Sequence, residues 1–162
     1  MKIVFEPMGP VHRKEVMDIY NYYVANSFAA YPDTTLPYEF YDKLLMMTKA
    51  YPAFVLKSTE HVVGFCFLHP HNPYPSFNEC AEVTYFIANE YTGQGFGKKA
   101  LQKLEAEAKE KGIRILLASI ASENQQSLTF HQRNGFTDCG RFKEVIKKNG
   151  KRFDIVWMQK WI

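Results

Sequence analysis

The chain has 162 residues, of which 46% are hydrophobic and 15% aromatic, which is enough to build the core of one domain over residues 1–162. Its 20 Lys and Arg residues against 17 Asp and Glu residues give a formal charge of only +3, and there is no long basic run, so a nucleic-acid partner is not expected. No apolar run approaches the roughly 18 residues that span a membrane.

Hydrophobic periodicity predicts two helices and three strands in the first half of the chain. The first helix carries an apolar stripe from Val11 to Ile19, and the second would direct Phe40, Leu44 and Met47 inward. In chain order we expect a strand at Ile3–Phe5, a helix at Val11–Val24, a loop at Asn26–Pro37, a helix at Tyr38–Ala50, a hairpin of strands at Ala53–Lys57 and Val62–Leu68, and a proline-rich loop at His69–Asn78.

The second half alternates strands and helices before ending in two strands. In chain order we expect a strand at Cys80–Ala88, a helix at Gly97–Lys111, an almost wholly apolar strand at Ile113–Ile120, a short helix at Asn124–Asn134, and strands at Phe136–Ile146 and Phe153–Trp161. This order predicts one mixed sheet flanked by helices, an α+β (α/β) class.

The cysteines indicate the redox environment. Cys66, Cys80 and Cys139 show no CxxC spacing, and an odd number without a framework favours reduced thiols. Charged residues between His12 and Asp18 argue against a secretory signal peptide. We therefore expect a cytoplasmic protein without a membrane partner.

The turn between the fourth strand and the third helix carries the strongest functional signal. Gly93, Gly95 and Gly97 alternate with other residues directly before a helix-forming sequence. Glycines at this density let backbone N–H groups converge without obstruction by Cβ atoms, and a helix start adds unpaired donors and a positive dipole end. The turn therefore predicts a cradle for an anionic phosphate group.

Several ligands could occupy such a cradle. A Walker-type phosphate loop would require Ser or Thr where Lys99 stands. Gly95–Ala100 satisfies the dinucleotide fingerprint, with Glu123 just beyond the next strand, but the motif lies in mid-chain with no room for six parallel strands. A glycine-rich connection without a ligand is a further alternative, and coenzyme A is the remaining candidate.

The flanking pattern resembles the GNAT N-acetyltransferase family. The family turn, [QR]-x-x-G-x-[GA], corresponds to Thr92–Gly97, with Thr92 in place of the usual Gln or Arg. Asn124–Phe136 reads Asn-x6-His-x3-Gly-Phe, and Lys148–Gln159 continues the likeness. Across essentially the whole chain, the sequence resembles the phosphinothricin or methionine sulfoximine N-acetyltransferase branch, which implies a mostly antiparallel twisted sheet of six or seven strands with about four helices.

The resemblance also implies a set of residues that bind acetyl-CoA. Backbone N–H groups of the turn would hold the pyrophosphate, and the exposed backbone of the preceding strand would pair with the pantetheine arm. An Asn at the start of the last helix contacts coenzyme A in the family, and it can also cap that helix. The implied residues are Tyr85, Phe86, Ile87, Thr92, Gly93, Gln94, Gly95, Phe96, Gly97, Lys98 and Asn124.

Two residues are candidates for acid–base chemistry. Acetyl transfer to an amine requires a neutral nitrogen, so a carboxylate must accept a proton from the ammonium, and Glu82 matches the family position for this base. On a polar strand face Glu82 could instead be merely solvated. His131 stands where many GNAT enzymes carry Tyr as the acid for the leaving thiolate, and its imidazole could act as acid, base or core hydrogen-bonding group.

The acceptor is the least defined part of the prediction. Phe28 and Tyr31 lie in the loop that shapes the acceptor pocket in relatives, and the resemblance implies a small-molecule amine, with an amino-acid analogue such as phosphinothricin as one example. Relatives commonly carry arginines in the loop before the catalytic strand, whereas His69–Phe77 has neither Arg nor Lys. His71, Tyr74 and Arg141 are the candidate substitutes.

Two further expectations complete the prediction. His69-Pro70-His71 lacks a third ligand at a plausible spacing, so no metal is expected. Relatives are often dimers, so the resemblance implies a homodimer. A coenzyme A-binding regulatory module without transfer activity is the non-enzymatic alternative, and a dinucleotide-binding protein is a second.

Overall fold

The computed structural model describes all residues from 1 to 162, and its helices and strands follow the predicted order. The strands are β1 (Val4–Pro7), β2 (Ala53–Ser58), β3 (His61–Pro70), β4 (Cys80–Ile87), β5 (Ile115–Ala121), β6 (Thr137–Lys148) and β7 (Lys151–Trp161). The helices are α1 (Arg13–Asn26), α2 (Phe40–Met47), α3 (Phe96–Glu110) and α4 (Gln125–Arg133). This confirms the predicted fold class.

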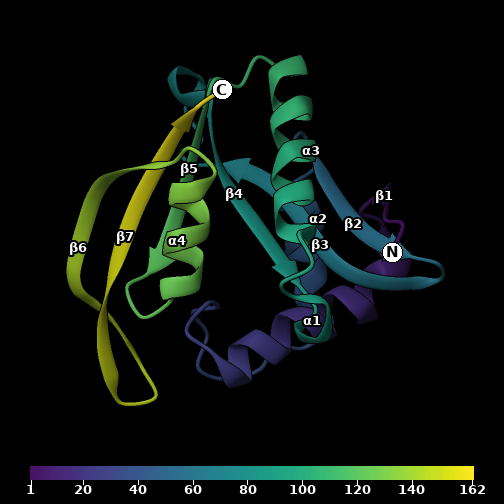
Figure 1. Ribbon diagram of the computed structural model, residues 1–162, viewed down its shortest axis with the longest axis horizontal. Coiled ribbons are helices and arrows are strands. Elements are labelled where there is room, and N and C mark those ends of the chain that lie inside the picture. Colours follow the sequence, from purple (N-terminus) through teal and green to yellow (C-terminus); the bar gives the residue numbers. More distant parts are fainter.

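All strands belong to one seven-stranded sheet with the order β1-β2-β3-β4-β5-β7-β6. Every neighbouring pair is antiparallel except β4 and β5. These two strands pair only where Cys80–Glu82 meets Ile115–Leu117, and beyond that point they diverge (Figure 1). The sheet is therefore not the parallel sheet of a dinucleotide-binding domain, and it is open in the middle.

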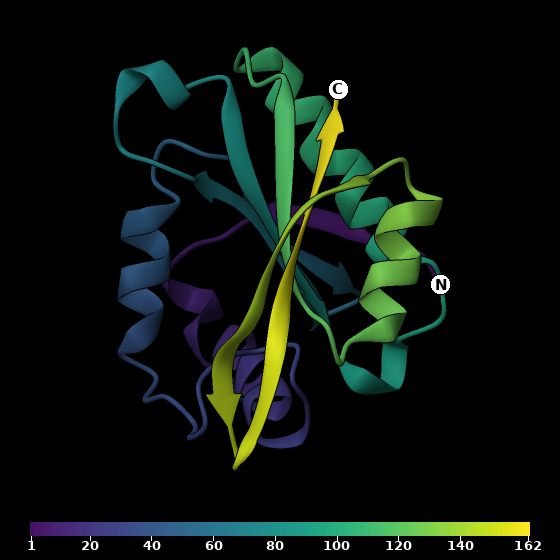
Figure 2. The same ribbon diagram turned by 90° about the vertical axis from the view of Figure 1, so that its left-hand side faces the viewer.

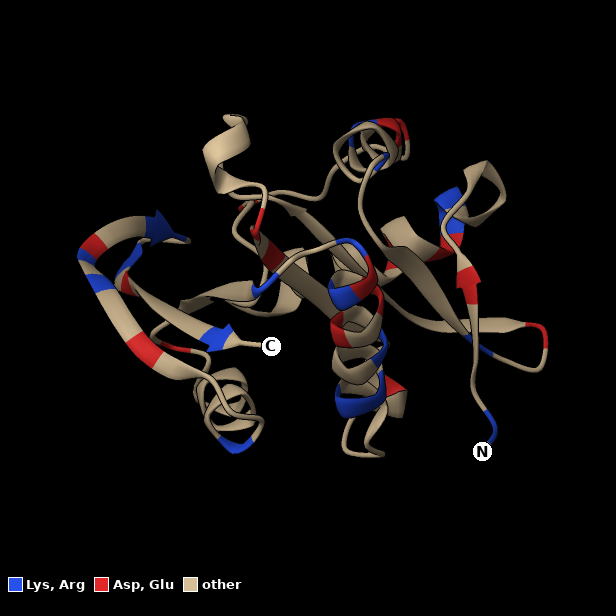
Figure 3. Cartoon of the chain, turned by 90° about the horizontal axis from the view of Figure 1, so that it is seen from above, with Lys and Arg blue, Asp and Glu red and all other residues tan.

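Helices cover both faces of the sheet, as Figures 2 and 3 show. On one face, the apolar side of α3 packs with β4, β5 and β7 through residues such as Leu101, Leu104 and Leu116. On the other face, α1 and α2 pack on β2 and β3 through Met17 and Tyr41. Burial of these apolar side chains holds the helices against the sheet. The two halves of the sheet are thereby fixed on opposite sides of the opening between β4 and β5.

Some local expectations were wrong. Val11 does not join the helical stripe but lies 84% exposed in a 3-10 turn before α1, because Pro10 opens this turn. Met47 is 37% exposed at the end of α2 rather than buried in the core. His69 and Pro70, expected in a loop, extend β3 and pair with Glu82 and Ala81. A proline is tolerated here because it is the last residue of its strand.

Two simpler observations concern the cysteines and the helices. All three cysteines are free thiols, with Cys66 buried and Cys139 exposed. None of the helices combines the length and the apolar character needed to cross a bilayer.

Candidate active site

A cavity of about 1290 Å³ occupies the opening between β4 and β5. Side chains alternate along β4, so Glu82, Thr84 and Phe86 face the α1–α2 side while Val83, Tyr85 and Ile87 face α3. Residues from both sets line the cavity, together with α4 and the loop after α1. The opening therefore connects the two faces of the sheet, and the base and histidine candidates lie on opposite faces.

The turn Thr92–Lys98, which we call the cofactor turn, lines one end of this cavity. Gly93 and Gly95 have φ values of +76° and +81°, a region that side chains rarely adopt. No backbone N–H from Gly93 to Lys98 finds an acceptor within the protein, and the first to do so is that of Lys99, which donates to the Gly95 carbonyl at 3.2 Å. The turn therefore offers a continuous row of unpaired donors.

The start of α3 adds positive charge to this row. The helix begins at Phe96 with no side-chain cap and no acidic residue in its first turn, which instead contains Lys98 and Lys99. Two lysines at the positive end of the helix dipole destabilise the start of α3 unless an anion lies near. Figure 3 shows how densely charged α3 is compared with α4, in which Arg133 is the one Lys or Arg residue. These features suit a phosphate group.

Glu82 lies on the other side of the opening, between two imidazoles. Its carboxylate is 3.0 Å from Nδ1 of His71 and 3.9 Å from Nε2 of His69. The strand pairing explains this position, because His69 lies directly across from Glu82 in the β3–β4 register. The Glu82 side chain is only 18% exposed, yet it lines the cavity, so a bound molecule could reach it.

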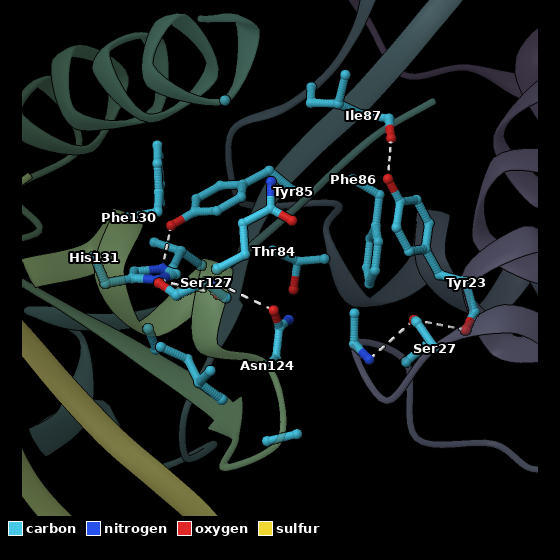
Figure 4. Close-up of a pocket in the computed structure, with 18 of the residues that line it drawn as sticks. Tyr23, Ser27, Thr84, Tyr85, Phe86, Ile87, Asn124, Ser127, Phe130 and His131 are labelled. Atoms are coloured by element: carbon cyan, nitrogen blue, oxygen red, sulfur yellow. Dashed lines mark hydrogen bonds between the residues drawn. The ribbon is translucent and has the colours of Figure 1, made fainter. Parts of the chain in front are cut away.

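His131 forms a buried hydrogen-bonded chain on the α3–α4 side (Figure 4). Its Nε2 accepts a hydrogen bond from the hydroxyl of Tyr85, and its Nδ1 donates to the Ser127 carbonyl at 2.7 Å. Burial lowers the pKa of His131 and raises that of Tyr85 well above its usual value. The histidine is therefore neutral near pH 7, with both ring nitrogens engaged.

Asn124 combines two of the roles expected for it. Its side-chain oxygen accepts a hydrogen bond from the Ser127 backbone N–H at 3.1 Å and so caps α4. The residue also lines the cavity, and its side-chain nitrogen makes no hydrogen bond within the protein. The capping bond fixes the direction in which this nitrogen points, which leaves it available to a ligand (Figure 4).

The cavity gathers most, but not all, of the predicted site residues. Phe28 and Tyr31 line it from the loop after α1, where the hydroxyl of Tyr31 hydrogen-bonds to that of Ser119 at 3.0 Å. Gln94, His71 and Tyr74 lie outside the lining. His71 still reaches the site through Glu82, whereas Tyr74 is 68% exposed.

The comparison with known proteins identifies the family. The profile of the Acetyltransferase (GNAT) family matches residues 16–136. The chain belongs to the GNAT acetyltransferase family. The match contains the opening between β4 and β5, the cofactor turn, Glu82 and His131, so the site described above lies inside the family domain.

Curated relatives and solved structures agree with this membership. The L-amino acid N-acyltransferase MnaT of Escherichia coli is 28% identical over 89% of this chain and 85% of its own length. The L-methionine sulfoximine/L-methionine sulfone acetyltransferase of Salmonella typhimurium is 26% identical over 89% and 85%. A Sinorhizobium meliloti phosphinothricin acetyltransferase, solved with acetyl-CoA, superimposes with a TM-score of 0.92 at 23% identity, covering 100% of this chain and 89% of that one. This GNAT protein is accordingly an N-acetyltransferase.

Sequence reasoning missed one residue that shapes the GNAT site. Lys148 is 1% exposed, and its ammonium donates to the carbonyls of Val24, Ser27 and Ala30 at 2.8, 2.7 and 2.7 Å. Burial lowers its pKa. It lies in a Lys-Lys-Asn-Gly turn, which indicates an exposed hairpin end, so no sequence signal distinguishes it from Lys147.

No group of three or more His, Cys, Asp or Glu side chains is arranged to hold a metal ion anywhere in residues 1–162. The imidazoles of His69 and His71 instead face the Glu82 carboxylate.

Proposed function

We propose that this GNAT enzyme transfers the acetyl group of acetyl-CoA to the primary amine of a small molecule, by direct attack in a ternary complex. The observation that carries the proposal is that the unpaired amides of Gly93–Lys98 and the Glu82 carboxylate open into one cavity. An anion-binding end and a basic end, joined through a split sheet, provide the two functions that acetyl transfer needs.

Each part of the site has a defined role in binding acetyl-CoA, which supplies the acetyl thioester. The amides of the cofactor turn would hold the pyrophosphate, assisted by the charge of Lys98. The unpaired edge of β4 at Tyr85–Ile87 would hydrogen-bond the pantetheine arm as an added strand does. The carbonyl of Ile87 already accepts a hydrogen bond from Tyr23, which marks the far end of that edge (Figure 4). Asn124 would contribute its free amide nitrogen.

Glu82 would act as the general base. An ammonium entering from the α1–α2 side would give its proton to this carboxylate, and the neutral amine would then attack the thioester carbonyl carbon. A C–N bond forms, the C–S bond breaks, and the proton that the attacking nitrogen then loses balances the one that the departing thiolate takes up. His69 and His71 face the carboxylate and provide a route for its proton to the solvent.

His131 is the second candidate for proton transfer. Because Tyr85 donates to its Nε2, the neutral imidazole has no proton to give at that atom. This favours a base or positioning role over that of an acid. A Tyr85→Phe variant frees Nε2: if His131 only positions Tyr85, Tyr85→Phe and His131→Asn will have equal effects on kcat and leave the pH–rate profile unchanged.

The names of the relatives suggest the first acceptors to test. Proteins 28% and 26% identical to this chain are named for L-amino acids and for methionine sulfoximine and sulfone. Amino-acid analogues of that kind, phosphinothricin included, are therefore candidate acceptors alongside simple amines.

Calorimetry with acetyl-CoA and a thiol-release assay with a panel of amines would test the proposal. We expect binding of acetyl-CoA in the micromolar range and release of coenzyme A that depends on the amine. Absence of binding at millimolar acetyl-CoA would refute the proposal. Binding without any amine-dependent thiol release would instead favour a coenzyme A-binding regulatory module.

A further inference from the structure

The part of the cavity on the α1–α2 side of the sheet, which we call the acceptor chamber, is built almost entirely from uncharged side chains. Its walls come from α1, the loop after it, α2, β3 and β4. Eight aromatic rings form most of these walls: Tyr20, Tyr23, Phe28, Tyr31, Phe40, Phe65, Phe67 and Phe86. The rings of Phe65 and Phe86 lie 5.5 Å apart, and those of Tyr20 and Phe86 5.4 Å apart. Such a surface suits an apolar or aromatic group.

Glu82 is the one charged side chain among those walls. The other charged residues that line the cavity lie elsewhere: Lys98 is in the cofactor turn, and Glu123 and Arg133 flank α4. A single carboxylate in an apolar chamber attracts an ammonium group and repels a second carboxylate. The chamber therefore favours the cationic end of an amine, and it offers an acid group the His69 imidazole and hydroxyl groups but no Lys or Arg.

Three cations close to the acceptor chamber are already committed to other partners. Lys148 lies behind the loop, where three carbonyls hold its ammonium. Lys151 lies over the ring of Phe28, and the carboxylate of Glu123 binds it at 2.7 Å. Arg141 is paired with Asp154 at 2.6 Å. None of these cations is free to neutralise a substrate carboxylate.

Resting on the proposed function, we propose that the acceptor is a primary amine on an apolar or aromatic body with no acid group beside the nitrogen. In an α-amino acid, one carbon separates the amine from the carboxylate. An amine placed for deprotonation by Glu82 would therefore bring that carboxylate close to the carboxylate of Glu82. Burial of an unpaired charge beside a like charge disfavours binding of the zwitterion.

Matched acceptor pairs test this proposal. Phenethylamine and phenylalanine differ only in the carboxylate, as do 3-(methylsulfonyl)propylamine and methionine sulfone. We expect kcat/KM, corrected for the fraction of neutral amine, to favour each simple amine by about tenfold or more. Phenylalaninamide keeps the bulk but not the charge, so it should behave like phenethylamine. Mass spectrometry of the acetylated product would confirm each transfer.

The possible outcomes separate this proposal from the proposed function. Equal or better turnover of the amino acids would overturn the acceptor class while leaving acetyl transfer intact. A low rate with phenylalaninamide would also overturn it, because size rather than charge would then decide. No thiol release with any member of the panel would refute acetyl transfer itself and this inference with it.

A variant pair tests the electrostatic argument directly. Met47 lines the chamber from α2 and is 37% exposed, so Met47→Arg adds a cation at low risk to folding. Met46 is 79% exposed and lies outside the lining, so Met46→Arg is the matched control. Met47→Arg should shift the preference toward the amino acids by at least threefold, and Met46→Arg should not. The same ratio in both variants and the parent would count against charge exclusion.

Discussion

In the proposed function, the cofactor turn and the acceptor chamber would recognise their ligands by different physical means. The cofactor turn uses backbone: two glycines at positive φ and a row of amides with no acceptor in the protein. The acceptor chamber uses side chains: aromatic walls, one carboxylate and two imidazoles beside it. A backbone site tolerates Thr92 in place of the usual Gln or Arg, because the backbone donors remain. A side-chain site instead changes its specificity with each substitution.

The largest expected effect comes from a variant that removes the proposed base on the acceptor side and leaves the cofactor turn unchanged. Glu82→Gln should lower kcat by about a hundredfold or more, since general bases contribute 10²–10⁴ in rate, and it should leave acetyl-CoA affinity unchanged. Steady-state kinetics and calorimetry would measure the two quantities. Glu79→Gln, an exposed change just before β4, is the matched control. Activity that survives in Glu82→Gln with its pH–rate profile intact would rule out this carboxylate as the base.

The next effect concerns the loop that forms a wall of the acceptor chamber. Lys148→Met removes an ammonium that donates hydrogen bonds to three carbonyls, and it should lower the free energy of unfolding by about 3 kcal/mol. This is less than the sum for three charged hydrogen bonds, because the variant no longer buries a charge. KM for the acceptor should rise while affinity for acetyl-CoA stays unchanged. Lys147→Met, on the exposed neighbour, should change neither. Equal denaturation curves for the two variants would contradict this assignment.

A smaller effect isolates the cofactor turn. Gly95→Ala forces a side chain into φ +81°, at a cost of about 1 kcal/mol, and should weaken acetyl-CoA binding about tenfold by moving the amides. Gly150→Ala imposes a similar strain at φ +79°, far from the turn. Both variants should lose similar stability in urea, and only Gly95→Ala should lose affinity in calorimetry. Matching affinities would mean that the turn does not hold the cofactor.

The smallest effect is a pH dependence of stability from His131. Burial lowers its pKa in the folded state, so below about pH 6.5 the unfolded chain binds a proton that the folded chain does not. Stability should therefore fall as pH decreases through this range, by at most about 1.4 kcal/mol per pH unit from this group. His131→Asn should flatten the slope, whereas His61→Asn, at an exposed histidine, should keep it. Parallel slopes in both variants would show that His131 is not responsible.

The sequence could predict features that depend on neighbouring residues, but not those that depend on distant ones. Element order, the glycine turn and the Asn124 cap are local features, so periodicity and turn chemistry were sufficient. The roles of residues that act through distant partners could not be predicted in this way. The burial of Lys148 depends on carbonyls more than a hundred positions away, and the hydrogen bond of Tyr85 to His131 depends on how β4 and α4 meet.

The position of His69 shows a third kind of limit. Pro70 and the prolines after it indicate a loop, and the strand nevertheless continues because Pro70 is its last residue. The register that follows places an imidazole opposite Glu82. Local propensity was overridden here by pairing between strands, and that pairing determined a feature of the site.

The short pairing of β4 with β5 has a mechanical consequence. Backbone pairing between the half-sheet that carries α1 and α2 and the half-sheet that carries α4 is limited to three residues of each strand, and the core under α3 is the other link between them. In the proposed binding mode, acetyl-CoA supplies part of the hydrogen bonding that the two strands lack, so a reactant also serves as a temporary strand. Release of coenzyme A then removes these hydrogen bonds at the end of each catalytic cycle. The stability of the protein therefore rises on binding and falls on release.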